Sequence, residues 1–105
     1  MASSYQATFQ VAGHPQAVEQ AVYHALVAAG LTSVHGGGGV VYGSVPISWT
    51  SWGENVTAVV GFGPAGALVT VESRCALPTQ LVDWGKNRKN VEQIVQHLRA
   101  LVPVY

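Results

Sequence analysis

The fold is decided by the segment GENVTAVVGFGPAGALVTVESRCA, residues 53–76. Two alternating runs flank the sequence Gly-Pro-Ala-Gly at 63–66, whose composition is typical of a turn. A period of two places successive side chains on opposite faces of a strand. In the second run the inward set is small or apolar: Ala67, Val69, Val71, Ser73 and Cys75. In the first run the more apolar face is Glu54, Val56, Ala58, Val60 and Phe62. The segment therefore predicts an antiparallel hairpin with one buried face.

Further strands extend this hairpin. Residues 4–11 alternate strictly, and residues 40–49 form a third run in which Pro46 suggests an edge strand or a bulge. Residues 31–35 fit either a short strand or an extended exit from a helix. The four glycines at 36–39 fit a flexible turn, because no Lys-Ser/Thr pair follows them as a phosphate loop requires.

Two helices complete the pattern. Apolar residues recur at three and four residues from Pro15 to Ala29, with Gly30 as the expected C-terminal cap. A second stripe predicts a helix over about 83–102, with Asp83 as its N-cap. The order β-α-β-β-β-α, with a possible extra strand near 31–35, predicts a two-layer α+β fold. We expect about four mostly antiparallel strands with both helices on one face.

Composition limits the classes of protein. The 105 residues suit a single domain, and 49% hydrophobic with 10% charged residues excludes disorder. Five basic and five acidic residues give zero net charge, which argues against nucleic-acid binding and favours self-association. The sequence has neither a recognisable leader nor a long apolar run, so we expect a cytoplasmic protein without a membrane span.

Cations gather around the start of the second predicted helix. Four of the five Lys and Arg residues lie between Arg74 and Lys89. Three of them, Lys86, Arg88 and Lys89, fall in the first two turns of the predicted helix, where positive charge opposes the helix dipole. Backbone N–H groups at a helix start bind phosphate or carboxylate. The pattern predicts an anion site whose ligand-binding candidates are Arg74, Trp84, Gly85, Lys86 and Asn87. The alternative is a solvated basic face on a helix that Asp83 caps.

Asn87 is a polar residue in the apolar stripe of this helix. A buried polar group must find a partner. Asp83 is four residues earlier, and the Ser73-Arg74 segment is placed to lie alongside. Asn87 either bonds the backbone of the 76–82 segment or forms the polar floor of a small pocket.

Catalytic and metal-binding patterns are missing from the sequence. The acidic residues are scattered, Cys75 is expected to be a buried, inert thiol, and the four histidines do not share a ligand spacing. His14 and His35 are expected in turns. We therefore predict no catalytic residues, no metal and no cofactor, and a protein that is not an enzyme.

Aromatic residues form a second candidate surface. Trp49 and Trp52 bracket the Thr50-Ser51 turn, and Tyr42 precedes them in the same predicted strand. They either stabilise a hairpin across its strands or form a contact surface, since Trp and Tyr are enriched at interfaces. We treat Tyr42, Trp49 and Trp52 as interface candidates.

Residues 71–98 resemble the C-terminal part of bacterial small domains of unknown function. Those domains carry a Ser-x-Ser-like strand, here Val71–Cys75, followed by Asp-x-Gly-x-Asn at a helix start, here Asp83–Asn87. Cys75 stands where a second Ser is usual, and Asn90 where a basic residue is common. The resemblance implies a fold neighbourhood and no activity.

Two functions follow as expectations. The first is a non-catalytic binding or assembly module that forms a homodimer, or binds a protein partner, through the open face or edge of its sheet. The alternative is a binder of small or lipid-like ligands, similar in outline to helix-grip folds. Its pocket would lie between sheet and helices, with an anionic group at the start of the last helix.

Overall fold

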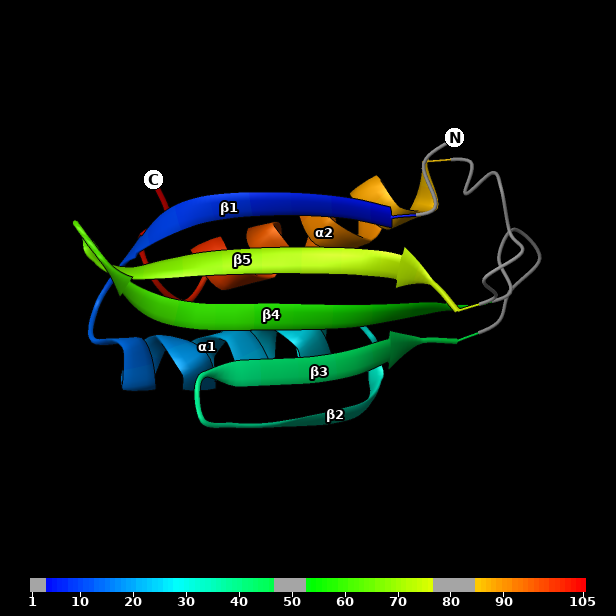
Figure 1. Cartoon of the computed structure of the whole chain (residues 1–105), viewed down its shortest axis with the longest axis horizontal. Helices are drawn as coiled ribbons and strands as arrows, with labels where there is room; N and C mark the ends of the chain where they lie inside the picture. The colour runs from blue at the N-terminus through cyan, green and yellow to red at the C-terminus, as the bar shows by residue number, and fades with distance from the viewer. Residues whose placement is uncertain (1–3, 47–52, 77–84) are drawn as a thin grey trace.

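Seven elements succeed one another along the chain in the computed structural model, which describes residues 4–46, 53–76 and 85–105. They are β1 (Ser4–Ala12), α1 (Pro15–Ala28), β2 (Thr32–Gly37), β3 (Val40–Val45), β4 (Glu54–Gly63), β5 (Gly66–Cys75) and α2 (Lys86–Arg99). Within these residues, the strands form one antiparallel sheet in the order β1-β5-β4-β3-β2. Both helices lie behind the sheet as it is viewed in Figure 1, so the predicted α+β class and two layers are confirmed.

The described sheet has five strands, so the expected number of about four is wrong. Residues 32–37 form the complete strand β2, and the first two glycines of the run belong to it. The turn consists of Gly38 and Gly39 alone. Their φ angles of 65° and 88° suit a two-residue hairpin turn, and residues with a side chain rarely adopt such positive values. His35 is therefore a strand residue opposite Tyr42, not a turn residue.

The core lies between the sheet and the helices. The inward sets predicted for 53–62 and 67–76 are buried, except for Phe62, which is 80% exposed at the far end of the hairpin. Val22 and Leu26 of α1 and Ile94 and Leu98 of α2 are fully buried against them. The helix layer therefore uses the apolar stripes that the sequence predicts.

Gly43 shows how closely the first helix and its exit approach the sheet. A Cβ at this position of β3 would lie 2.9 Å from Leu31 Cδ2 and 3.2 Å from Leu26 Cδ2. A side chain there would push the exit of α1 away from β3, because packed interiors hold few voids.

Two predicted boundaries change. β3 ends at Val45 instead of residue 49, because Pro46 follows it and cannot donate to a ladder; residues 47–49 lie outside the described part. α2 begins at Lys86 with Gly85 (φ 75°) in the N-cap position, and Asp83, the expected N-cap, lies outside the described residues. Among the described residues, no helix is long and apolar enough to cross a membrane.

The C-terminal residues return to the sheet and pair with the end of β1. The Ala12 N–H donates to the Pro103 carbonyl at 3.0 Å, and the Tyr105 N–H donates to the Gln10 carbonyl at 2.8 Å. Val104 thus stands opposite Val11 in an antiparallel bridge. Residues 103–105 therefore cover part of the outer edge of β1.

Candidate functional site

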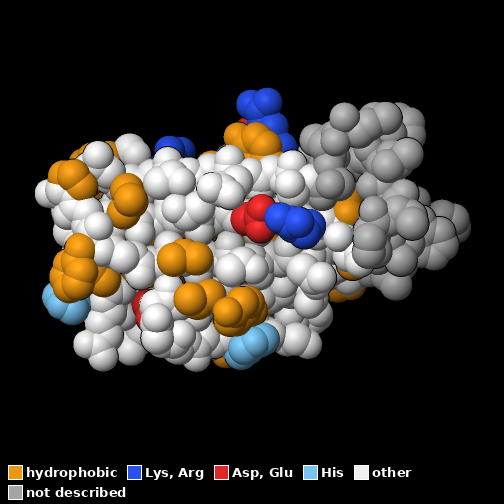
Figure 2. All heavy atoms as spheres, in the orientation of Figure 1, with side chains coloured by type: hydrophobic (Ala, Val, Ile, Leu, Met, Phe, Trp, Pro, Cys, Tyr) orange, Lys and Arg blue, Asp and Glu red, His pale blue; other side chains and the backbone are white. Residues whose placement is uncertain are grey.

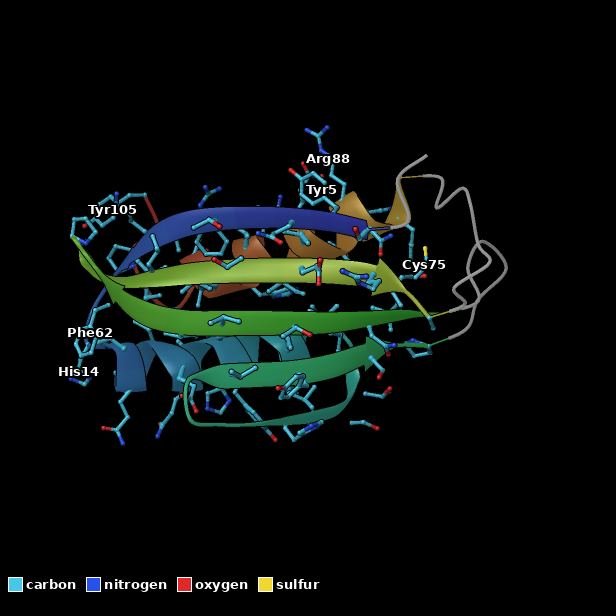
Figure 3. All side chains as sticks on the ribbon, in the orientation of Figure 1. Tyr5, His14, Phe62, Cys75, Arg88 and Tyr105 are labelled. Atoms are coloured by element: carbon cyan, nitrogen blue, oxygen red, sulfur yellow. The ribbon has the colours of Figure 1, made fainter. Side chains whose placement is uncertain are left out.

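Five polar or sulfur-bearing side chains meet in the interior where β4 begins, β5 ends and α2 starts. They are Glu54, Ser73, Cys75, Asn87 and Asn90, and each is at most 6% exposed. We call them the polar cluster. Figure 3 labels Cys75 at this end of the molecule. A buried polar group is stable only with hydrogen-bond partners, so the geometry of the cluster decides its role.

The cluster is connected by hydrogen bonds. Asn90 Nδ2 donates to Glu54 Oε1 at 2.7 Å and to Ser73 Oγ at 3.1 Å. Ser73 Oγ donates to Asn87 Oδ1 at 2.8 Å, and Asn87 Nδ2 contacts Cys75 Sγ at 3.3 Å as a donor. One chain of contacts therefore joins α2 to β4 and β5. It fixes the position of the first two turns of α2 on the sheet.

The sequence builds this cluster by keeping the strand and helix periods. Glu54 is in phase with the inward residues of β4, and Ser73 and Cys75 are in phase with those of β5. Asn87 and Asn90 are three residues apart on α2, which places them on the same face of the helix. Strand and helix faces that are apolar elsewhere thus become polar at one end.

A hollow opens beside the cluster, between the end of α1 and the start of α2. Its volume is about 300 Å³, and its lining is Ala29, Gly30, Leu31, Val45, Pro46, Lys86, Asn90 and Gln93. Asn90 therefore bonds the cluster on one side and faces the hollow on the other. Among the described residues, Lys86 has no ion-pair partner.

The structure brings three of the predicted ligand-binding residues to this region. Gly85, Lys86 and Asn87 stand in succession at the start of α2, and Asn87 is fully buried in the cluster. Arg74 does not join them, because its position in β5 points to the opposite face of the sheet. There its guanidinium pairs with Glu72 at 3.0 Å. Trp84 lies outside the described residues.

The predicted interface residues are only partly described. Tyr42 is 43% exposed on the open face of the sheet, where its ring stacks on that of His35 with centroids 5.1 Å apart. Trp49 and Trp52 lie outside the described residues. Figure 2 shows this open face, on which scattered apolar groups surround an adjacent acidic and basic side chain.

Sequence reasoning places the Ser73-Arg74 segment beside Asn87, but it misses the side-chain contacts of Glu54, Ser73 and Asn90. A signal for each was present: Glu54 and Ser73 fall in the inward phase of their strands, and Asn90 precedes Ile94 by four residues in the helix stripe. A polar residue in phase with a buried face predicts a buried hydrogen bond. Asn87 alone was weighed in this way.

The cluster offers hydrogen-bond donors and acceptors rather than a recognised catalytic set. Among the described residues, no group of three His, Cys, Asp or Glu side chains is arranged to hold a metal ion. His14 instead caps α1 by accepting from the Gln16 N–H at 3.2 Å. The arrangement of the cluster thus suits structural support and polar recognition.

The outer edge of β1 forms a second candidate surface. Beside it lies a groove of about 490 Å³ between β1 and α2, lined by Tyr5, Ala7, Thr8, Phe9, Val91, Glu92, Val95, Gln96 and Arg99. We call it the edge groove. The Arg88 guanidinium carbon lies 5.9 Å from the centroid of the Tyr5 ring. Figure 3 labels both side chains. In the described part of the chain, no strand pairs with Ser4–Phe9 on this outer side.

The backbone N–H and C=O groups of successive β1 residues point alternately toward β5 and toward the outer edge of the sheet. Gln10 and Ala12 use their outward C=O and N–H groups to bond residues 103–105. Because these groups alternate along an antiparallel strand, those of Ser4, Gln6 and Thr8 point to the same outer side. The edge groove therefore runs beside a row of strand-pairing groups.

Comparison with known proteins gives no match: no family model, no curated protein and no solved structure corresponds to this chain.

Proposed function

We propose that this domain is a non-catalytic assembly module that forms a homodimer by pairing the β1 strands of two copies. The observation that carries the proposal is the outer edge of β1, with its pairing groups beside the edge groove, whose lining includes Tyr5, Phe9 and Val95. An edge strand with unpaired N–H and C=O groups is a template for another strand. Residues 103–105 already use the end of this edge in that way.

The remaining length of β1 favours a specific register. Residues 103–105 take Gln10–Ala12, which leaves the outward groups of Ser4, Gln6 and Thr8. A two-fold axis through Gln6 pairs Gln6 with its copy and Ser4 with Thr8 of the second copy. A symmetric contact of this kind uses the same patch on both subunits, as is usual in homodimers.

The side chains of β1 are complementary in that register. On the helix side, Tyr5 comes opposite Ala7 of the second copy, so each large ring meets a small methyl group. On the other side, uncharged Ser, Gln and Thr face one another. Ser4–Ala12 contains no charged residue, so no like charges are brought together within the paired strands.

Crosslinking tests this register. Hydrogen-bonded partners in an antiparallel pair have Cα atoms about 5.5 Å apart, which matches a disulfide. We expect Gln6→Cys to form a covalent dimer under mild oxidation, with Cys75 protected by burial. His35→Cys, on β2, is the matched control and should stay monomeric under the same oxidation.

Sedimentation equilibrium of the unmodified chain completes the test. We expect a monomer–dimer equilibrium at micromolar concentration. A strict monomer at hundreds of micromolar contradicts the proposal. Equal crosslinking at residues 6 and 35 contradicts the proposed register, and crosslinking at residue 35 alone favours the open face around Tyr42, with which His35 stacks.

We place this assembly in the cytoplasm, a setting that suits a chain with one free, buried thiol.

A further inference from the structure

We propose that the hollow between the end of α1 and the start of α2 binds a small carboxylate that carries a hydroxyl or amino group on an apolar body. This inference is independent of the proposed dimer. The lining of the hollow comes from α1 and its exit, the end of β3 with Pro46, and α2; β1 contributes none of it.

The charged end of the ligand is set by Lys86. This residue lines the hollow, is half-buried, and has no ion-pair partner among the described residues. It is also the first residue of α2, whose first turn contains no acidic residue. The positive end of the helix dipole and the ammonium therefore favour an anion at the same place.

A hydrogen-bond donor on the ligand is required by Asn90. This side chain is 4% exposed, and its Nδ2 is committed to Glu54 and Ser73. Its Oδ1 accepts no hydrogen bond within the described part of the chain, although Asn90 lines the hollow. An acceptor in such a place is matched by a hydroxyl or ammonium donor, since a buried polar atom without a partner is costly.

The apolar body of the ligand is set by the opposite wall. Ala29, Leu31, Val45 and Pro46 present aliphatic surface, while Lys86 and Asn90 are on α2. A volume of about 300 Å³ accommodates a small organic acid and excludes a long acyl chain that remains fully inside. Mandelate combines the three required features: a carboxylate, an adjacent hydroxyl and a phenyl ring.

The experiment is a titration followed by the backbone amide signals of ¹⁵N-labelled protein. Mandelate is compared with phenylacetate, which lacks the hydroxyl, and with methyl mandelate, which lacks the charge. We expect saturable shifts at Gly30, Leu31, Asn90 and Gln93. Each control compound should bind about tenfold more weakly, because each loses one hydrogen bond or charge contact.

Two variants locate the charge. Lys86→Met is expected to weaken mandelate binding about tenfold. Lys89→Met is the matched control, since Lys89 is exposed in the same helical turn and does not line the hollow. We expect its affinity to equal that of the parent. The same spectra report whether each variant is folded.

Ala29→Leu provides a test that leaves every charge in place. Its larger side chain fills the hollow from the α1 side and should abolish the shifts. The proposal is overturned by shifts that do not saturate, by equal affinity for mandelate and phenylacetate, or by equal losses in the two lysine variants. The last result would mean that the helix start attracts anions without using the hollow.

Discussion

The two edges of the sheet differ in regularity. β1 is nine residues long and keeps one register with β5, from Ser4 opposite Arg74 to Ala12 opposite Gly66. β2 has six residues, and its register with β3 shifts between Thr32 and His35. Ser33, inside that shift, has a φ of 53°, which is unusual for a residue with a side chain. One edge is a regular strand and the other is interrupted.

The spaces beside the two edges differ in volume. The edge groove next to β1 contains Tyr5, Phe9, Val91 and Val95 and has a volume of about 490 Å³. A separate space next to β2, distinct from the hollow at the start of α2, is about 260 Å³ and is lined by Glu19, Gln20, Tyr23, His24, Gly36 and Val41. Both spaces have linings that mix apolar and polar side chains, since Glu92, Gln96 and Arg99 also line the edge groove, so the contrast between the edges rests on the regularity of their strands.

This difference indicates which edge strand is suited to pairing with a strand of a second copy. Proteins commonly protect an edge strand by making it short, irregular, charged or proline-containing. β2 is short and irregular, whereas β1 is long, regular and free of charge and proline. The contrast supports β1 as the contact strand, and the following variants either break the contrast or measure its parts.

The largest effect is expected when the support behind β1 is removed. α2 packs behind β1 and β5, and Asn90 anchors it to Glu54 and Ser73. Asn90→Ala leaves these buried groups short of a donor and should lower the free energy of unfolding by about 3 kcal/mol. Urea denaturation measures the change. Gln93→Ala, an exposed residue on the same helix, is the control and should change stability by at most about 0.5 kcal/mol.

Equal losses in the two variants would mean that the hydrogen bonds of Asn90 contribute little, and that α2 is held by its apolar stripe alone.

The second effect concerns association and not stability. Ala7 lies in the edge groove, half-buried, on the strand proposed to pair. In the monomer, a lysine at this position reaches solvent past the edge; in the dimer, Tyr5 of the second copy would cover its charge. We expect Ala7→Lys to raise the dimer dissociation constant about 100-fold, as measured by sedimentation equilibrium.

His35→Lys makes the corresponding change on β2 and should leave the dissociation constant unchanged. An effect at residue 35 as large as that at residue 7 would contradict the contrast between the two edges.

The third effect tests the hairpin that holds β2. The Gly39 N–H donates to Glu19 Oε1 at 2.7 Å, and the Gly39 carbonyl accepts from the Val60 N–H at 2.7 Å. Gly39→Ala would place a Cβ 3.0 Å from the Val60 carbonyl oxygen on a backbone with a φ of 88°. We expect this variant to lower the free energy of unfolding by about 2 kcal/mol.

Gly38→Ala has the same backbone problem, with a φ of 65°, but no atom lies within 4 Å of its Cβ. This variant should lower the free energy of unfolding, measured by thermal or urea denaturation, by about 1 kcal/mol. A larger loss at Gly38 than at Gly39 would contradict the proposed role of the crowded contact.

The smallest effect should come from relieving the irregularity of β2. Ser33→Gly removes the side chain at a φ of 53° but increases the freedom of the unfolded chain. The two contributions nearly cancel, and we expect a gain of about 0.5 kcal/mol in the free energy of unfolding. A clear loss would mean that the hydroxyl of Ser33 stabilises the irregular segment.

Much of the fold could be predicted from the sequence because periodicity reports burial. The alternation in 53–62 and 67–76 identified the inward faces, and the three-and-four spacing identified Val22 and Leu26 of α1. Residues 31–35 give a weak strand signal, so the sequence does not distinguish a short strand from an extended exit there. The backbone of a two-glycine turn, not a side-chain pattern, determines where that strand ends.

The site was less predictable because it depends on contacts between distant segments. Glu54, Ser73 and Asn90 come from three elements, and only strand register and helix packing bring them together. Arg74 was grouped with Lys86 through its nearness in sequence. The alternation of β5 turns it to the other face of the sheet. Local pattern gives the face of a residue, and it cannot give that residue's partner across the fold.

The short return of residues 103–105 has a consequence for the size of the assembly. It blocks one end of β1, so an incoming strand can use only Ser4–Thr8, and one symmetric contact consumes that whole length. Each two-subunit sheet then ends on both sides in an interrupted β2, where a third copy finds no regular template. The proposed assembly is therefore self-limiting, and the domain can expose a pairing edge without growing into filaments.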